Sequence, residues 1–173
     1  YFEDELRPVH DVEVRLVGGH TSERYTKALT SLVASLELEH TVIFTGRVSD
    51  KELAHEYQQA HVFCCLSDHE GFGVPLLEAM SHGLPVVAYD SSAVGETIGG
   101  AGVLLTDKQP TTVATALERV LVDDHLSNAM VIAGRQRAAS FSEQRCADEF
   151  ETALAAAWRN HDTGTKVEER SGK

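Results

Sequence analysis

Two glutamates frame a glycine-containing segment in the middle of the chain, and these residue types suggest binding chemistry. Glu70 precedes Gly71 and Gly73, and Glu78 follows them. Glycines permit backbone conformations and close approaches that a Cβ would block, so the N–H groups of such a loop can point at the oxygen atoms of a ligand. A carboxylate can accept hydrogen bonds from two neighbouring hydroxyl groups. The segment therefore predicts a site for a ligand that carries both an anionic group and hydroxyls.

Pro75 favours the start of a helix directly after this loop. The N-terminus of a helix has a partial positive charge and is a natural site for phosphate or diphosphate. Each glutamate alone is as readily explained as a solvated loop residue or a favourable first-turn acid. Together with the glycine loop, Glu70 and Glu78 instead suit the hydroxyls of a pyranose and of a ribose. The pattern of hydroxyls, diphosphate and hydroxyls is that of a nucleotide sugar.

The elements that must position this segment follow from hydrophobic periodicity and turn residues. The expected strands are 12–17, 41–45, 62–66, 85–89 and 102–105, and the expected helices are 22–36, 49–60, 75–83, 93–98, 112–122, 126–140 and 142–159. Residues 62–66 are apolar throughout, which predicts a strand covered on both faces. Ser49 and Glu52 form a capping-box pattern at the start of a helix.

Strands that alternate with helices through short connections predict a doubly wound α/β fold, a parallel sheet with helices on both faces. Ligands bind such sheets at the carboxyl ends of the strands. We therefore expect the site in the loops that follow Val17, Phe44, Leu66 and Tyr89.

Composition excludes several other classes of protein. The chain has 173 residues and a formal net charge of -12, which disfavours binding to nucleic acid or to an anionic membrane surface. It has no apolar run long enough to cross a bilayer. Its three cysteines form no CxxC pair and are expected to be small apolar core residues in a reducing compartment. Nine histidines occur without a metal-binding spacing, so no metal site is expected.

The central segment resembles the signature of the retaining glycosyltransferases of family 4 (group 1), which have the GT-B fold. That signature is a Glu, seven residues and a Glu, as in Glu70 to Glu78. Other blocks are similar in the same order: Val17-Gly18-Gly19, Phe44-Thr45-Gly46-Arg47-Val48-Ser49, Ala79 to Ala88, Glu96 to Leu104, and Phe141-Ser142. The resemblance covers about residues 10 to 158 and implies the C-terminal, donor-binding domain of such an enzyme, with a Rossmann-like sheet.

The resemblance also implies roles for single residues. Glu70 contacts hydroxyls of the transferred sugar and stabilises the oxocarbenium-like transition state, and Glu78 contacts the ribose. The N–H groups of Phe72, Gly73 and Val74 hold the diphosphate and the sugar. The Val48-Ser49 stretch meets the nucleobase, largely through its main chain. The residues implied in donor binding are Gly71, Phe72, Gly73, Val74, Glu78, Val48, Ser49, Arg47 and Gly19.

Family members also use an Arg and a Lys after the first strand of this domain to neutralise the diphosphate, and this chain begins after that point. We expect residues 1–159 to form a donor domain that lacks its first strand, and residues 160–173 to form a disordered tail. The acceptor domain is expected to be absent, so that this chain alone is expected to be inactive. Arg47 is a candidate cation, or equally a solvated arginine.

The resemblance leaves the substrates open. GDP-mannose and UDP-linked sugars both suit the site, no metal or other cofactor is expected, and the acceptor is a glycan or lipid-linked glycan bound by the missing half. A cytoplasmic enzyme of polysaccharide assembly is expected, peripheral at the inner membrane face through that half. The alternatives are a sugar-nucleotide epimerase of the same fold, against which the block order argues, and a non-catalytic nucleotide-sugar-binding or scaffold module.

Several other residues are expected to have structural rather than chemical roles. Tyr25 and Trp158 lie at helical positions and are interpreted as packing residues. His69, next to Glu70, is interpreted as a loop-surface residue. The run Arg135-Gln136-Arg137 is interpreted as a solvated helix face.

Overall fold

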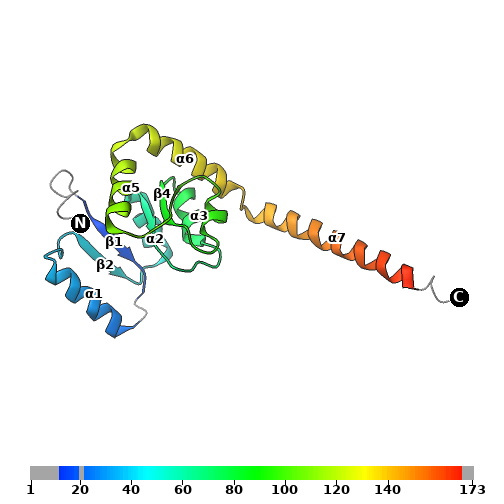
Figure 1. The fold of residues 1–173 in the computed structure, drawn as a ribbon, viewed down its shortest axis with the longest axis horizontal. Coiled ribbons are helices and arrows are strands. Elements are labelled where there is room, and N and C mark those ends of the chain that lie inside the picture. Colours follow the sequence, from blue (N-terminus) through cyan, green and yellow to red (C-terminus); the bar gives the residue numbers. More distant parts are fainter. Residues whose placement is uncertain (1–11, 20–21, 169–173) are drawn as a thin grey trace. The chain divides into compact units, whose positions relative to one another are not determined.

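A computed structural model of the chain describes residues 12–19 and 22–168 (Figure 1). The strands are β1 (Val14–Val17), β2 (Val42–Gly46), β3 (Phe63–Cys65), β4 (Val86–Tyr89) and β5 (Val103–Leu105). The helices are α1 (Glu23–Ser35), α2 (Asp50–Gln59), α3 (Val74–Ser81), α4 (Val94–Ile98), α5 (Pro110–Val122), α6 (Asp124–Ala139) and α7 (Glu143–Glu168). The predicted alternation of strands and helices is confirmed through β5.

Two helix starts follow the predicted capping chemistry. Ser22 accepts a hydrogen bond from the N–H of Tyr25 at the start of α1. Ser49 and Glu52 form the expected capping box at the start of α2, each side chain satisfying the other residue's N–H. These caps satisfy donors that the first turn of a helix leaves unpaired.

All strand pairs are parallel, and the strands form two sheets. One has the order β1-β2 and the other β3-β4-β5. In the doubly wound order 3-2-1-4-5-6, these sets fit the 3-2 pair and the 4-5-6 trio. Among the described residues, no strand occupies the first position. No hydrogen-bonded ladder joins β1 to β3 within the described residues. The predicted α/β class is thus confirmed, with a sheet in two parts.

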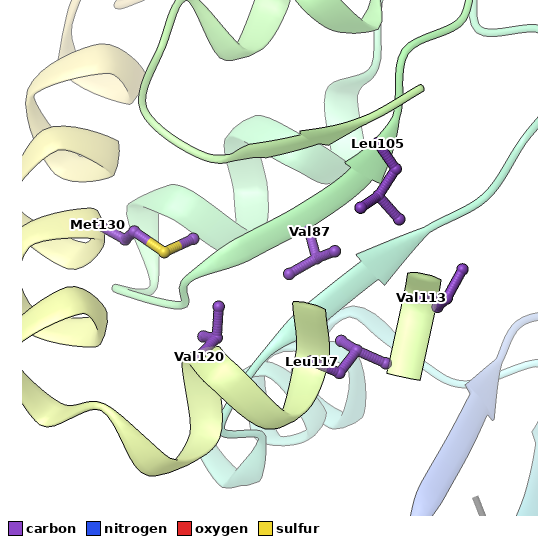
Figure 2. Packing of buried hydrophobic residues seen from close by; sticks show 6 residues of the cluster. All are labelled: Val87, Leu105, Val113, Leu117, Val120 and Met130. Atoms are coloured by element: carbon purple, nitrogen blue, oxygen red, sulfur yellow. The ribbon is translucent and has the colours of Figure 1, made fainter. Parts of the chain in front are cut away.

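The main hydrophobic core lies between the three-stranded sheet and the helices that follow it (Figure 2). Its buried members are Val87, Leu105, Val113, Leu117, Val120 and Met130. Val87 comes from β4 and Leu105 from β5, while the other side chains come from α5 and α6. Successive strand residues face opposite sides of a sheet, so Val86 and Ala88 point away from this cluster.

The opposite side of β4 is covered as well, because Val86 and Ala88 are fully buried. Helices α3 and α4 supply the fully buried side chains Leu76, Met80, Val94 and Ile98. This double coverage explains why β4 reads as an unbroken apolar run in the sequence. It also gives α3, which follows the glycine loop, a rigid base.

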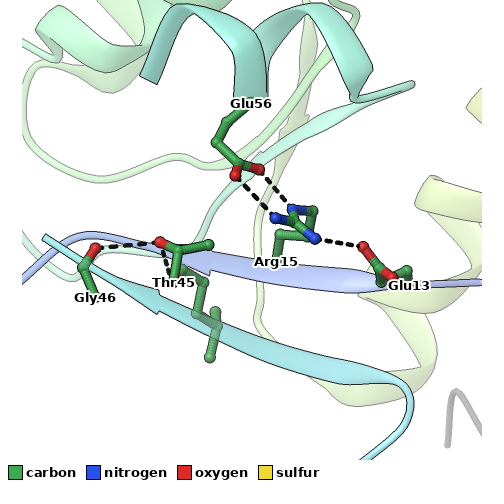
Figure 3. A network of polar contacts seen from close by, with 6 residues as sticks. Glu13, Arg15, Thr45, Gly46 and Glu56 are labelled. Carbon is green, nitrogen blue, oxygen red and sulfur yellow. Dashed lines mark hydrogen bonds and ion pairs between the residues drawn. The ribbon is translucent and has the colours of Figure 1, made fainter. Parts of the chain in front are cut away.

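An ion-pair network connects β1 to α2 (Figure 3). The Arg15 guanidinium donates to both carboxylate oxygens of Glu56, at 2.5 and 2.8 Å, and to Glu13 at 2.8 Å. Hydrogen bonding to Arg15 lowers the pKa of Glu56 below its ordinary value, and the same contact raises the pKa of Arg15. A bidentate pair of this kind fixes direction as well as distance.

Several residues that were predicted to be buried are exposed. Strand β3 is not covered on both faces, because Cys64 is exposed. One edge of β3 has no strand neighbour in the described chain either, since β3 pairs only with β4 there. Cys146 is exposed too, so the prediction of core cysteines was wrong for both residues. Helix α1 has no buried residue, and Tyr25 is 58% exposed rather than packed.

The chain divides into two compact units after Arg137. The second unit contains α7, on which Phe150, Leu154 and Trp158 are exposed. Trp158 was therefore wrongly interpreted as a packing residue. The helix continues to Glu168, so residues 160–168 are helical rather than part of a disordered tail; Gly164 costs a helix only about 1 kcal/mol. The rest of the predicted tail, 169–173, lies outside the described residues.

Candidate functional site

The glycine loop joins the end of β3 to the start of α3, as the sequence predicts. Gly73 is the N-cap of α3 and has a φ of 84°, in the left-handed region. A Cβ at this position would lie 2.7 Å from Leu76 Cδ1. Gly73 therefore needs to be glycine for two reasons, its backbone conformation and its contact with the core. The loop enters the helix with Val74 at its first position. Pro75 has no N–H, and the N–H of Leu76 donates to the carbonyl of Gly73 at 2.9 Å, so the N–H groups that this turn offers to a ligand are those of Gly73 and Val74.

The segment between β4 and the end of α4 holds the glycine loop in place through three hydrogen bonds. The Ser91 hydroxyl donates to the carbonyl of Ser67 at 2.7 Å, and the N–H of Ala93 donates to the carbonyl of Glu70 at 3.4 Å. The buried Thr97 hydroxyl donates to the carbonyl of Phe72. The loop is thus shaped by its neighbour at the same edge of the sheet.

Arg137 supports this arrangement from α6. Its guanidinium donates to the carbonyls of Thr97, at 3.0 Å, and Glu96, at 2.6 Å, at the C-terminal end of α4. The interpretation of Arg135-Gln136-Arg137 as a solvated face was therefore wrong for Arg137, which is partly buried. No local sequence pattern indicates this contact, because the two segments are 40 residues apart in the chain.

Side chains before Glu70 are also engaged. Lys108, between β5 and α5, forms an ion pair with Asp68 and lies 5.0 Å from the centre of the Tyr89 ring. The Nδ1 atom of His69 lies 2.8 Å from the Ser92 hydroxyl. His69 is exposed, as predicted for a loop-surface residue. These contacts fix the start of the loop and leave the partly buried Glu70 carboxylate without a hydrogen bond or ion pair within residues 12–19 and 22–168.

Glu78 lies on α3 and is held by a residue that sequence reasoning missed. The Tyr57 hydroxyl, from the last turns of α2, donates to Glu78 Oε2 at 3.0 Å. Burial, together with the hydrogen bond to Glu78, raises the pKa of Tyr57, so this phenol remains a neutral donor. The only sequence signal was a tyrosine on a largely polar helix, and that signal does not identify its partner.

Val48 and Ser49 lie where β2 leads into α2. Glu52 accepts hydrogen bonds from the N–H and the hydroxyl of Ser49, both at 2.7 Å, and these bonds lower the pKa of Glu52. The carbonyl of Ser49 accepts from the N–H of Leu53 at 2.8 Å. The main-chain groups of Ser49 are therefore engaged in the helix cap.

The structure brings Gly19 and Arg47 together at the ends of β1 and β2. The N–H of Gly18 donates to the carbonyl of Gly46 at 3.1 Å, and a Cβ on Gly19 would lie 3.9 Å from the Arg47 Cβ. Arg47 is exposed. No hydrogen bond or ion pair in the described part of the chain connects Gly19 or Arg47 to the glycine loop. The predicted site residues thus fall into two groups. Gly19 and residues 47–49 follow the strands of the β1-β2 sheet, and residues 70–78 follow β3 of the other sheet.

The described residues contain no cluster of three or more His, Cys, Asp or Glu side chains that could hold a metal ion. No helix in this part of the chain combines the length and apolar character needed to span a bilayer.

Residues 4–137 match the family described as glycosyl transferases group 1. Among curated relatives, the chain is similar to the O-antigen chain mannosyltransferase B of Escherichia coli, with 32% identity over 118 residues. This match covers 68% of the chain and 31% of the relative. The chain spans about a third of the length of the curated relatives it matches.

Solved structures agree with the fold. Anabaena HepE, in complex with UDP and glucose, has a TM-score of 0.75 and 24% identity, over 84% of this chain and 41% of that one. The C-terminal domain of the group 1 family protein LpcC from Francisella tularensis has a TM-score of 0.60 and 27% identity. That match covers 69% of this chain and 63% of the LpcC domain.

Proposed function

The chain belongs to the glycosyl transferases of group 1, and we propose that it is the donor-binding, C-terminal half of an enzyme that transfers a sugar from a nucleotide-diphosphate sugar with retention of configuration. The observation that carries this proposal is the loop between β3 and α3. It places Glu70 before, and Glu78 after, a left-handed glycine at a helix N-terminus. The order of carboxylate, backbone N–H groups and carboxylate along this segment matches the order of sugar hydroxyls, diphosphate and ribose hydroxyls in the donor.

In this proposal each part of the donor has its own partner. The Glu70 carboxylate accepts hydrogen bonds from hydroxyls of the transferred sugar, and the N–H groups of Phe72, Gly73 and Val74 hold the diphosphate and the sugar. Glu78 accepts from the ribose. The bond between the anomeric carbon and the nucleoside diphosphate breaks, and the acceptor oxygen bonds to that carbon on the same face. The acceptor proton passes to the departing phosphate oxygen, while Glu70 stabilises the positive charge that develops on the sugar.

The nucleobase lies near the start of α2 in this proposal. Because the N–H and carbonyl of Ser49 are engaged in the helix cap, its main-chain contacts fall on Val48. Gly19 and Arg47 flank this end of the site from the β1-β2 sheet. The absence of a Cβ at Gly19 leaves room for a ligand beside Arg47.

A diphosphate next to two carboxylates requires cations. We propose that Arg47 supplies at most part of this charge and that an arginine and a lysine outside this chain supply the rest. The two-part sheet supports this, because no strand of the described residues occupies the first position, between the 3-2 pair and the 4-5-6 trio. We expect the chain by itself to transfer no sugar.

The proposed donors are GDP-mannose and UDP-linked sugars. The first is supported by the name of a Mycolicibacterium smegmatis relative, a GDP-mannose-dependent mannosyltransferase that is 32% identical over 138 residues. The UDP and glucose bound to Anabaena HepE support the second. We propose that the acceptor is a glycan or a lipid-linked glycan. The transfer needs no metal ion and takes place in the cytoplasm.

The test measures binding and transfer with the full-length protein that contains this chain. Thermal shifts with GDP, UDP and ADP sugars identify the nucleotide, and Glu78→Ala is expected to lower the affinity for it about tenfold, the loss of a charged hydrogen bond. Glu70→Gln is expected to lower kcat at least a hundredfold while nucleoside diphosphate binding stays unchanged.

Three results would contradict the proposal. Binding without any transfer would favour a non-catalytic module, and affinity unchanged in Glu78→Ala would remove the ribose assignment. Failure of every nucleotide sugar to bind the full-length protein would remove the donor site altogether. Glu39→Ala, a change at an exposed residue between α1 and β2, is the matched control and should alter nothing.

A further inference from the structure

Tyr57 contacts Glu78, the residue that we propose binds the ribose of the donor. Its side chain is 8% exposed, and its hydroxyl donates to Glu78 Oε2 at 3.0 Å. The two residues come from different helices, Tyr57 from α2 and Glu78 from α3. The hydrogen bond engages one carboxylate oxygen and leaves Oε1 without a partner in the described part of the chain.

The Tyr57 ring is itself held on two sides. It stacks on the His82 ring, with centroids 5.2 Å apart and planes at 15°, at the C-terminal end of α3. It also packs against Phe63 of β3, with centroids 6.0 Å apart and planes at 50°. Because the ring cannot turn freely, the direction of its hydroxyl is fixed. Burial raises the pKa of this phenol, so it acts as a donor at neutral pH.

We infer that Tyr57 is a positioning residue for nucleotide recognition, which holds one oxygen of Glu78 so that the other faces the ribose hydroxyls. This inference rests on the proposed function. A glutamate side chain has several rotatable bonds, and ordering it only when the ligand arrives would reduce affinity. With Tyr57 in place, that ordering is part of the fold before the donor binds. The residue acts through Glu78 and does not touch the donor.

A second explanation is that Tyr57 only packs α2 against α3. The two explanations differ in what happens when the hydroxyl alone is removed. Tyr57→Phe keeps the ring contacts with His82 and Phe63, so packing is retained. A positioning role predicts a loss confined to ligands that carry ribose hydroxyls, whereas a packing role predicts the same effect with every nucleotide.

The experiment measures dissociation constants of the full-length protein for UDP and GDP and for their 2′,3′-dideoxy analogues. We expect Tyr57→Phe to weaken binding of the preferred ribonucleotide about five- to tenfold and to leave its dideoxy analogue unchanged, as for one hydrogen bond to a charged group. KM for the donor should rise to the same extent with kcat unchanged. Tyr25→Phe, at a position 58% exposed on α1, is the matched control and should change none of these values.

Glu78→Gln separates failure of this inference from failure of the proposed function. If Glu78→Gln removes the preference for the ribonucleotide but Tyr57→Phe retains it, the role of Tyr57 is wrong and the ribose assignment stands. If Tyr57→Phe weakens both kinds of nucleotide equally, its role is packing. If Glu78→Gln leaves the preference intact, Glu78 is not the ribose ligand, and the site in the proposed function is wrong. We expect instead that adding Tyr57→Phe to the Glu78→Gln variant causes no further loss of affinity for the ribonucleotide.

Discussion

At the scale of single residues, the two glycines of the loop have different reasons to be glycine. Gly73 has a positive φ, and a Cβ there would meet Leu76. Gly71 has neither constraint, because a Cβ there would meet no atom within 4 Å in the described structure. The fold itself therefore requires Gly73, whereas for Gly71 we propose a different reason, the close approach of a ligand.

We predict that Gly73→Ala lowers the free energy of unfolding by about 1–3 kcal/mol, because it combines a left-handed residue with a steric conflict. Gly71→Ala should change that energy by less than about 0.5 kcal/mol and yet weaken nucleotide-sugar binding. Urea unfolding and a binding titration measure the two effects. Equal stability losses in both variants, or undisturbed binding in Gly71→Ala, would contradict this division of roles.

At the scale of elements, the glycine loop depends on α4 and α6 as much as on β3 and α3. Thr97 bonds to the loop with its side chain, and its carbonyl accepts from Arg137. This chain of contacts runs from α6 through α4 to the carbonyl of Phe72. The shape of the loop is therefore set by helices that follow it in the sequence.

Replacing Arg137 with Met should remove two charged hydrogen bonds from the end of α4 while retaining most of the aliphatic stem. We predict a loss of about 1–3 kcal/mol in the free energy of unfolding and faster amide exchange in the glycine loop. Arg135→Met, an exposed neighbour on the same helix, is the control and should have little effect. An equal loss of unfolding free energy in both variants would show that the two hydrogen bonds from Arg137 to α4 are not the cause.

At the scale of the whole molecule, a net charge of -12 gives no long-range attraction for an anionic donor. Capture of such a ligand then depends on local N–H groups, a helix terminus and nearby cations. The Arg15 guanidinium does not serve this purpose, because it is engaged with Glu56 and connects β1 to α2.

This ion pair makes the stability of the fold depend on pH. Arg15 lowers the pKa of Glu56 below its ordinary value of 4.5, so the stabilisation is complete above that value and is lost as the pH falls through the folded pKa. We predict that wild type is more stable than Glu56→Gln at pH 7 and that the difference narrows below about pH 4.5. Thermal unfolding from pH 7 to pH 3 measures this, with the exposed Glu39→Gln as control. A constant difference over that range would mean that charge is not the cause.

The sequence by itself determined the order of strands and helices, two of the helix caps and the location of the glycine loop between β3 and α3. These features depend on periodicity, on turn residues and on side chains a few positions apart, so a linear pattern records them. The roles of Gly73 and Pro75 at the start of α3 belong to this group, because they follow from local backbone chemistry.

Only the tertiary structure decided which residues support the site. Tyr57 meets Glu78 and Arg137 meets Thr97 across 21 and 40 positions of sequence, and no local pattern encodes such pairs. Burial was misjudged for the same reason, because the exposure of Cys64 depends on which distant segments cover its face of β3. Local interactions are recorded in the spacing of residues, whereas contacts between distant segments exist only once the chain has folded.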